Sequence, residues 1–241
     1  MLKKIKTYFE ISIEFVLDLI FPKYCVGCEK EGAWICPTCQ SKIILIKSTY
    51  CPTCHRLTKD GKFCPRCKLR SYLAGVVVAA HYKEGPLKEA IHTYKYEGVF
   101  DLKKDLSKIL IQALATRKFQ GQWILIPVPL HKNKLHERGY NQSLLLCEEI
   151  HKKIDNFSIL NNKLIKKINT TSQVTSTTRH ARLKNPIGSF DWIGGVKELE
   201  NKNIILVDDI YTTGATMQEC AKILKAKAKA KKVWGLVLAQ S

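Results

Sequence analysis

The sequence predicts an α/β protein in which a mostly parallel sheet is flanked by helices and preceded by a small cysteine-rich domain. From Gly75 onward, short apolar runs alternate with stretches of helical periodicity, a pattern typical of parallel sheets. Eight of the ten cysteines lie between Cys25 and Cys67, which indicates a separate local unit. The chain has 241 residues, 45% of them hydrophobic, and this suffices for one medium domain and one small domain.

Residues 1–22 are predicted to form an amphipathic helix. The stretch from Ile5 to Phe21 is apolar on one face, is shorter than the about 20 residues that cross a bilayer, and contains three acidic residues. We therefore expect neither a transmembrane segment nor a secretory signal. Packing against the body of the protein is the favoured interpretation. The alternative is peripheral membrane contact through three basic residues, Lys3, Lys4 and Lys6.

Residues 23–70 are predicted to form a double zinc ribbon. They contain four Cys-x-x-Cys knuckles: Cys25/Cys28, Cys36/Cys39, Cys51/Cys54 and Cys64/Cys67. Two knuckles together supply four thiolates at about 2.3 Å from one zinc ion, which closes a tetrahedral structural site. Similar spacing in the two halves and the turn residues Gly32 and Gly61 indicate an internal duplication. We predict two zinc sites, each made by consecutive knuckles, with cross-braced pairing as the alternative.

Other roles for these cysteines are less favoured. Because we expect no secretory signal, we predict a cytoplasmic protein in a reducing compartment, where disulfides are rare. A redox Cys-x-x-Cys motif usually opens a helix of a thioredoxin-like unit, whereas these knuckles repeat in a segment with little apolar periodicity. His55 is interpreted as a solvated loop residue, because four cysteines already complete each site.

Residues 71–241 are predicted to form the α/β domain, with the boundary between Arg70 and Gly75. The predicted strands are Val76–Tyr82, Trp123–Val128, Ile204–Val207 and Val233–Ala239. The predicted helices are Leu87–Tyr96, Leu102–Thr116, Asn141–Lys153 and a further helix after Thr216.

The run from Ile204 to Thr216 is the most informative stretch. Four apolar residues lead into Asp208 and Asp209, and ligands gather at the carboxyl ends of such strands in open α/β sheets. The next loop offers backbone N–H groups, hydroxyls and a glycine that permits a tight turn. Its residues are Thr212, Thr213, Gly214, Ala215 and Thr216. Apolar residues then recur at helical spacing: Met217, Cys220, Ala221, Leu224 and Ala228. Because a helix N-terminus favours an anion, this loop suits a phosphate group without any lysine.

A second loop is predicted on the opposite side of such a ligand. The strand that starts at Trp123 leaves the sheet through Pro127, Val128 and Pro129. Further on, Arg138 presents a fork of donors that suits phosphate oxygens, with a surface ion pair as the alternative. Asn141 is expected to cap the next helix.

The stretch from Asn169 to Phe190 is polar and cannot bury itself. Long polar loops in compact domains are often lids, and Arg179 and Arg182 would close such a lid over an anionic ligand. A solvated loop is the alternative. Lys95 is expected either to approach the same anion or to end a helix in solvent.

Several motifs occur in a fixed order, and together they carry a family resemblance. The run from Ile204 to Thr216 resembles the phosphoribosyl pyrophosphate (PRPP) signature of type I phosphoribosyltransferases. The other motifs are the cysteine-rich ribbon, Lys95-Tyr96-Glu97-Gly98, Pro127-Val128-Pro129, Arg138-Gly139-Tyr140-Asn141-Gln142 and Arg182-x-x-Asn185. The ordered set resembles the ComF family of competence-associated proteins.

The resemblance implies a type I phosphoribosyltransferase-like domain and a site for PRPP with Mg²⁺. Asp208 and Asp209 would be the catalytic acids that hold the ribose hydroxyls, and the loop from Thr212 to Thr216 would hold the 5-phosphate. The residues on the pyrophosphate side would be Pro127, Val128, Pro129, Arg138, Arg179, Arg182 and Lys95. The family's link to natural transformation implies incoming single-stranded DNA and a competence helicase as partners.

The charge fits more than one function. The formal net charge is +19, or about +15 with two filled four-thiolate zinc sites. Such an excess favours nucleic acid or the anionic PRPP. Six lysines between Lys222 and Lys232 can track a phosphate backbone, or simply form a solvated helix face. Four tyrosines can stack on bases or pack in the protein: Tyr50, Tyr72, Tyr94 and Tyr96.

Three functions therefore remain open from the sequence. The first is a phosphoribosyltransferase whose acceptor is unknown, since no segment resembles a base pocket. The second is a PRPP-sensing protein that binds single-stranded DNA without catalysis. In the third, the zinc ribbon docks a helicase.

Overall fold

The computed structural model describes residues 21–46, 50–83, 85–117, 119–168 and 186–240. Most of the predicted N-terminal helix lies outside these residues, as do Arg179 and Arg182. In the part of the chain that the structure describes, no helix has both the length and the apolar character to cross a membrane.

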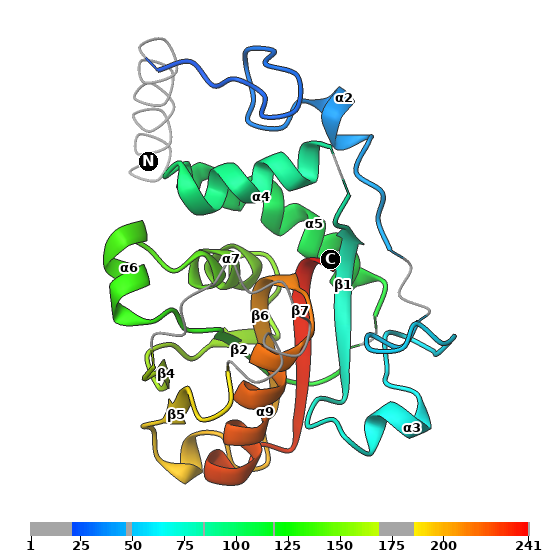
Figure 1. Ribbon diagram of the computed structural model, residues 1–241, viewed down its shortest axis with the longest axis vertical. Coiled ribbons are helices and arrows are strands. Elements are labelled where there is room, and N and C mark those ends of the chain that lie inside the picture. The colour runs from blue at the N-terminus through cyan, green and yellow to red at the C-terminus, as the bar shows by residue number, and fades with distance from the viewer. Residues whose placement is uncertain (1–20, 47–49, 84, 118, 169–185, 241) are drawn as a thin grey trace, which may run out of the picture.

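A five-stranded parallel sheet forms the centre of the larger domain (Figure 1). Its strands, in spatial order, are β1 (Gly75–His81), β7 (Lys232–Gln240), β6 (Asn203–Tyr211), β2 (Trp123–Pro127) and β3 (Phe157–Ile159). The predicted mostly parallel sheet is therefore confirmed. The central strands read as continuous apolar runs because both faces of the sheet are covered.

Two apolar cores lie on the two faces of the sheet. On one face, α4 (Pro86–Tyr96), α5 (Lys103–Ala115) and α7 (Gln142–His151) pack against Val77, Leu125 and Ile205. On the other face, α9 (Ala215–Ala228) packs against Val76, Ile204 and Leu206. The predicted apolar stripe of α9 is buried as expected: Met217, Cys220, Ala221, Leu224 and Ala228. Helices on both faces make this a three-layer α/β domain.

Several short elements were not predicted. They are α6 (Lys132–Arg138), the 3₁₀ turns Phe100–Leu102 and Val196–Glu198, and the strands β3, β4 (Leu164–Lys166) and β5 (Phe190–Trp192). The last two pair antiparallel in a small separate sheet, with Leu164 opposite Trp192. Three-residue strands are too short to show a periodic apolar pattern in sequence.

Each zinc ribbon is a compact unit around four cysteines. The first group is Cys25, Cys28, Cys36 and Cys39, and the second is Cys51, Cys54, Cys64 and Cys67. In each group the sulfurs lie within 4.8 Å of one another, so consecutive knuckles pair as predicted. Each unit ends in one helical turn that starts with proline, α2 (Pro37–Gln40) and α3 (Pro65–Lys68). His55 is exposed and lies outside the second group.

The two ribbons repeat the same backbone geometry, which supports a duplication. An antiparallel bridge joins Tyr24 to Glu31 in the first unit and Tyr50 to Leu57 in the second. The residue after the second cysteine of each unit is left-handed, with φ of 59° at Glu29 and 57° at His55. Equivalent turns at equivalent knuckles indicate that both units are built for the same metal geometry.

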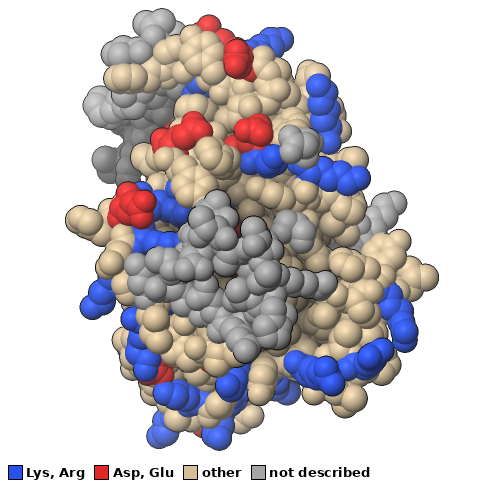
Figure 2. All heavy atoms as spheres, viewed as in Figure 1, with Lys and Arg blue, Asp and Glu red and all other residues tan. Residues whose placement is uncertain are grey.

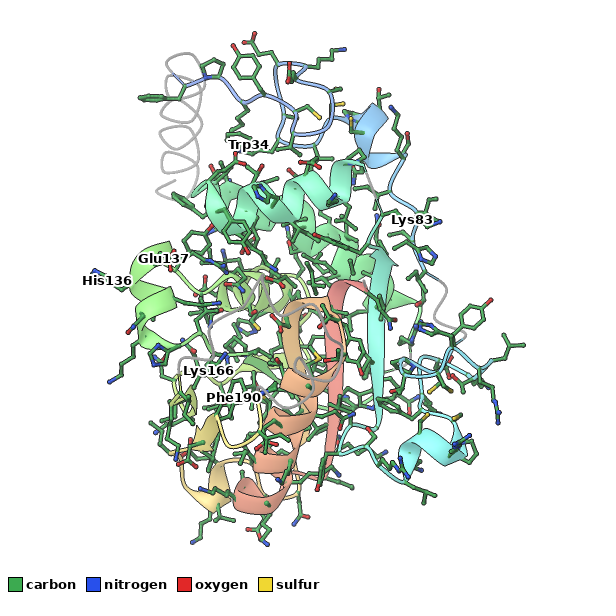
Figure 3. The ribbon with its side chains drawn as sticks, viewed as in Figure 1. Trp34, Lys83, His136, Glu137, Lys166 and Phe190 are labelled. Atoms are coloured by element: carbon green, nitrogen blue, oxygen red, sulfur yellow. The ribbon has the colours of Figure 1, made fainter. Side chains whose placement is uncertain are left out.

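The ribbons cover different parts of the α/β domain (Figure 1). The first lies over α4, where Trp34 packs against the core that α4 shares (Figure 3). The segment between the ribbons and the second ribbon lie along β1, through the bridges Leu45–Ala80 and Lys62–Gly75. This pairing covers the exposed edge of the sheet, where an open strand would otherwise invite aggregation.

Candidate functional site

The acidic pair lies near the carboxyl end of β6, beside a gap in the sheet. β6 pairs with β2 only as far as Val207 opposite Pro127, but with β7 it continues to Tyr211 opposite Gln240. The strand therefore runs past both acids instead of ending before them. Because β2 ends opposite Val207, β6 has no strand partner on that side at Asp208 and Asp209, and both acids border the space beyond the end of β2.

Asp209 is buried and tied to two other elements. Its side chain accepts a contact of 2.7 Å from Lys95 Nζ and a hydrogen bond of 3.0 Å from Gln142 Nε2. Asp209 is only 4% exposed. Burial tends to lower the pKa of Lys95, but the charges of Asp209 and Asp208 outweigh it and raise that pKa. Lys95 is thus a protonated partner of the acidic pair, and it joins α4 to β6.

Asp208 is held in a different way. Its Oδ1 accepts hydrogen bonds from Ser143 Oγ at 3.2 Å and from the backbone N–H of Asp209 at 2.9 Å. Burial and the neighbouring charge of Asp209 raise the pKa of Asp208 to about 7. The two carboxyl groups therefore differ, since Asp209 has a lysine and Asp208 has only neutral donors.

This raised pKa predicts how stability changes with pH. The pKa of Asp208 is about 7 in the folded state, against 3.8 for the free side chain. Between these two pH values the folded state therefore keeps a proton that the unfolded state has released. The associated stability is fully present below about pH 4 and is lost as the pH rises through about 7. We expect Asp208→Asn to gain stability relative to wild type between pH 5 and pH 8, as measured by urea unfolding. A stability difference that stays constant with pH would show that Asp208 does not titrate in this range.

The loop after β6 has the properties of an anion-binding turn. Gly214 caps α9 with φ of 76°, and a Cβ placed there would overlap the ring of Tyr211. Gly214 has no side chain that could cap the helix N-terminus. The N–H of Ala215 donates to Thr213 Oγ1 at 3.4 Å. The next N–H groups of the first turn, those of Thr216 and Met217, have the position at which helix N-termini bind anions.

The predicted second loop lies across the gap from the acidic pair. The backbone N–H of Val128 donates to the carbonyl of Val207 at 2.9 Å, so β2 leaves the sheet at this point. Asn141 caps α7, as expected, by accepting from Ser143 N at 2.9 Å. It also donates to the carbonyl of Val128 at 3.2 Å and thereby fixes the loop to the helix.

Arg138 belongs to the same hydrogen-bonded chain as the acids. Its Nη1 donates to Gln142 Oε1 at 2.6 Å, and its guanidinium lies 5.5 Å from the ring centre of Tyr96. Gln142 in turn donates to Asp209. Arg138 also lines a cavity of about 440 Å³. The other residues of this cavity are Lys95, Tyr96, Glu97, Gly98, Lys134 and Glu137, of which Figure 3 shows Glu137 on α6.

Sequence reasoning missed Gln142 and Ser143 as site residues. Both lie in the first turn of α7, directly after the cap Asn141. Their polar side chains are buried, at 4% and 0% exposure, which signals a local function for their hydrogen bonds. The motif that contains Arg138 did include Gln142, but its contact with Asp209 joins residues far apart in the chain.

A larger cavity, of about 790 Å³, lies between α6, the start of α7 and β4. Its lining includes Leu130, Tyr140, Leu164 and Lys166. Lys166 Nζ lies 5.5 Å from the ring centre of Phe190, and burial lowers the pKa of Lys166 (Figure 3). A mostly apolar cavity of this size with a few polar groups suits a small molecule.

The cysteine groups have the chemistry of structural zinc sites. The backbone N–H of Cys36 donates to Cys25 Sγ at 3.3 Å. Burial opposes ionisation of Cys25, but this and other hydrogen bonds outweigh it and lower the pKa of Cys25 to about 6. The pKa of Cys51 falls to about 7 for the same reasons. Four converging thiols with N–H donors around them fit a closed tetrahedral zinc shell.

Two four-cysteine ribbons precede a mostly parallel α/β domain in which paired acids lie on β6 and a glycine turn follows it, and these features define an α/β protein with a double zinc ribbon. Residues 16–68 match a family model described as "Double zinc ribbon domain". The chain is 30% identical to "Competence protein F" of Haemophilus influenzae, over 85% of this chain and 96% of that protein. It belongs to the ComF family.

Other relatives agree with this assignment. The chain is 29% identical to "Competence protein ComFC" of Bacillus subtilis, over 88% of this chain and 86% of that protein. It is 27% identical to "DNA utilization protein YhgH" of Escherichia coli, over 84% of this chain and 96% of that protein. Among solved structures, it is similar to a hypoxanthine phosphoribosyltransferase from Trypanosoma cruzi in complex with IMP. That likeness has 13% identity and a TM-score of 0.31, and covers 61% of this chain and 64% of that one.

Proposed function

We propose that this protein binds PRPP with Mg²⁺ at the carboxyl end of β6 and acts in DNA uptake during natural transformation, on incoming single-stranded DNA in the cytoplasm. The observation that supports it best is the joint placement of an acidic pair that contacts Lys95 and a helix N-terminus whose cap, Gly214, has no side chain. Asp208 and Asp209 lie on β6, four and three residues before the loop that starts at Thr212. The names of the relatives support the link to competence and DNA use.

Each side of the site has a role in this proposal. Asp208 and Asp209 accept hydrogen bonds from the ribose hydroxyls. The loop from Thr212 to Thr216 donates hydrogen bonds from its N–H groups and hydroxyls to the 5-phosphate. Arg138 and the Pro127–Pro129 loop adjoin the pyrophosphate, with Arg179 and Arg182 as further candidates. Two carboxylates suit Mg²⁺, which would neutralise charge on the pyrophosphate when bound.

As an enzyme, the protein would transfer phosphoribose from PRPP to a nitrogen nucleophile. The bond between ribose C1 and the pyrophosphate oxygen breaks, and a bond from C1 to the nitrogen forms. Negative charge grows on the departing pyrophosphate, and Arg138 is positioned to stabilise it. The cavity of about 790 Å³ is the best candidate for the acceptor, because its size and lining suit a small molecule.

The second candidate is a PRPP-sensing module that binds single-stranded DNA or a helicase without turnover. Lysine and arginine side chains gather around α9 at one end of the molecule (Figure 2). Part of this charge is compensated, because Lys227 pairs with Asp191 at 2.5 Å. Tyr50 and Tyr72 are exposed and available for stacking. Tyr96 is exposed too, but Arg138 lies over its ring, and Tyr94 is fully buried.

Three assays separate the candidates. Pyrophosphate release from PRPP and Mg²⁺, with a panel of bases, amines and single-stranded DNA, is expected for an enzyme and requires one acceptor. Direct DNA binding predicts an affinity that falls steeply between about 50 and 200 mM salt. Helicase docking predicts instead that deletion of the ribbon abolishes co-purification and spares DNA binding. Zinc-loaded protein that neither binds nor turns over PRPP would contradict the proposal.

A further inference from the structure

The segment that directly follows the second zinc ribbon contacts the first turn of α9, just after the proposed anion-binding loop. The backbone N–H of Tyr72 donates to Gln218 Oε1 at 2.9 Å. The side chain of Gln218 then donates from Nε2 to Ser71 Oγ at 2.8 Å. The oxygen and the nitrogen of the Gln218 side-chain amide therefore both form hydrogen bonds with the segment that follows the last cysteine of the ribbon. Since Gln218 is in the first turn of α9, these bonds hold that turn against the segment after the ribbon.

A residue of the third knuckle lies near Tyr211, the residue that packs under the loop. Thr53, between Cys51 and Cys54, lines the same cavity as Tyr211. Tyr211 is 3% exposed, and its ring fills the space under Gly214. The position of this ring therefore determines how closely the loop can turn.

The knuckle is fixed to the end of the sheet by a further contact. Gln240 Nε2 donates to the carbonyl of Pro52 at 2.9 Å, and Gln240 is the strand partner of Tyr211. Pro52 and Thr53 lie inside a Cys-x-x-Cys knuckle, whose shape depends on the metal that its sulfurs hold. The second cysteine group and Tyr211 are thus joined through Pro52 and Gln240.

A cavity of about 360 Å³ lies at the same junction. Arg66 and Arg70 of the ribbon line it together with Thr213 of the loop. The remaining lining residues include Thr53, Ser71 and Gln218, and none of the lining residues is a carboxylate. The ribbon therefore adds positive charge beside a loop that has no lysine of its own.

We propose that the second zinc ribbon is a positioning element of the 5-phosphate loop, acting through Pro52 and Gln240 on Tyr211 and through Ser71 and Tyr72 on Gln218. The proposal rests on the proposed function and extends it. It gives the two ribbons separate roles. The first packs on α4, which carries Lys95, whereas the second braces the loop between β6 and α9. A phosphate ester bound by the loop would therefore depend on the second metal site for its affinity.

The test uses Gln218→Ala and Gln240→Ala in the full-length, zinc-loaded protein. Ribose 5-phosphate and inorganic pyrophosphate are each titrated by calorimetry. Each variant is expected to weaken ribose 5-phosphate binding about tenfold, as for loss of one or two hydrogen bonds. Pyrophosphate affinity and the content of two zinc ions per chain are expected to stay as in wild type. A loss of ribose 5-phosphate affinity with unchanged pyrophosphate affinity and zinc content distinguishes positioning of the loop from general loss of structure.

Arg117→Ala is the matched control. Arg117 Nε donates to the carbonyl of Asp60 at 3.2 Å, so it also joins the second ribbon to the α/β domain, but away from the loop. It is expected to bind ribose 5-phosphate as wild type does. If both test variants kept the wild-type affinity for ribose 5-phosphate, the inference about the second ribbon would be overturned. The same holds if the control lost as much affinity as the test variants, and in both cases the proposed function would stand. A wild-type protein that binds neither PRPP nor ribose 5-phosphate would overturn the proposed function together with it.

Discussion

Exchange of both Asp208 and Asp209 for asparagine is expected to lower the affinity for PRPP with Mg²⁺ at least about 100-fold. A hydrogen bond to a charged group contributes about 1.5–3 kcal/mol, and each 1.4 kcal/mol is tenfold in affinity. Asparagine keeps the shape of the side chain but loses the charge that the ribose hydroxyls and the metal require. Calorimetric titration of PRPP into wild type and variant measures the change.

The variant also changes the surroundings of Lys95. Asp209 contacts Lys95 Nζ at 2.7 Å, with side-chain exposures of 6% and 15%. Removal of one partner of a buried ion pair costs about 3–5 kcal/mol, so the melting temperature is expected to fall as well. Asp105→Asn is the matched control, because Asp105 pairs with Lys108 on the surface of α5. Wild-type affinity in a folded double variant would show that these acids do not bind the ligand.

Replacement of Cys39 by serine is expected to reduce the zinc content from two ions per chain to one and to lower the melting temperature strongly. Cys39 is fully buried in the first cysteine group. Structural zinc contributes about 10–16 kcal/mol in isolated zinc-finger peptides. Because the first ribbon packs on α4, its loss also uncovers the apolar face that contains Leu87 and Ile91. Metal analysis and thermal unfolding measure the two effects.

Cys147→Ser provides the control for this experiment. Cys147 is buried in α7, outside both cysteine groups. We expect this variant to retain two zinc ions even if its core packing is weakened. Retention of two ions by Cys39→Ser would contradict the assignment of the first site.

The sequence predicted the long elements well because their signals are local. The apolar runs at β1, β6 and β7 and the helical stripe of α9 each lie within one short window. The cysteine spacing was similarly informative, since a four-thiol site needs two knuckles close together. Consecutive pairing required the structure, because spacing alone permits a cross-braced arrangement.

The parts that sequence could not predict depend on contacts between distant segments. β6 extends to Tyr211 because β7 continues to pair with it after β2 has ended. The ion pair between Lys95 of α4 and Asp209 of β6 could not be predicted from the sequence, and the expected approach of Lys95 to pyrophosphate stays a prediction. Gln142 and Ser143 appear in sequence as ordinary first-turn residues. Their roles become visible only when α7 is placed beside β6.

Titration of PRPP with Mg²⁺ into the zinc-loaded wild-type protein tests the central claim most directly. We predict saturable binding of one PRPP per chain, with ribose 5-phosphate and pyrophosphate each competing for part of the same site. Absence of binding by a folded protein that holds two zinc ions would contradict the claim that the acids of β6 and the loop after it form a PRPP site.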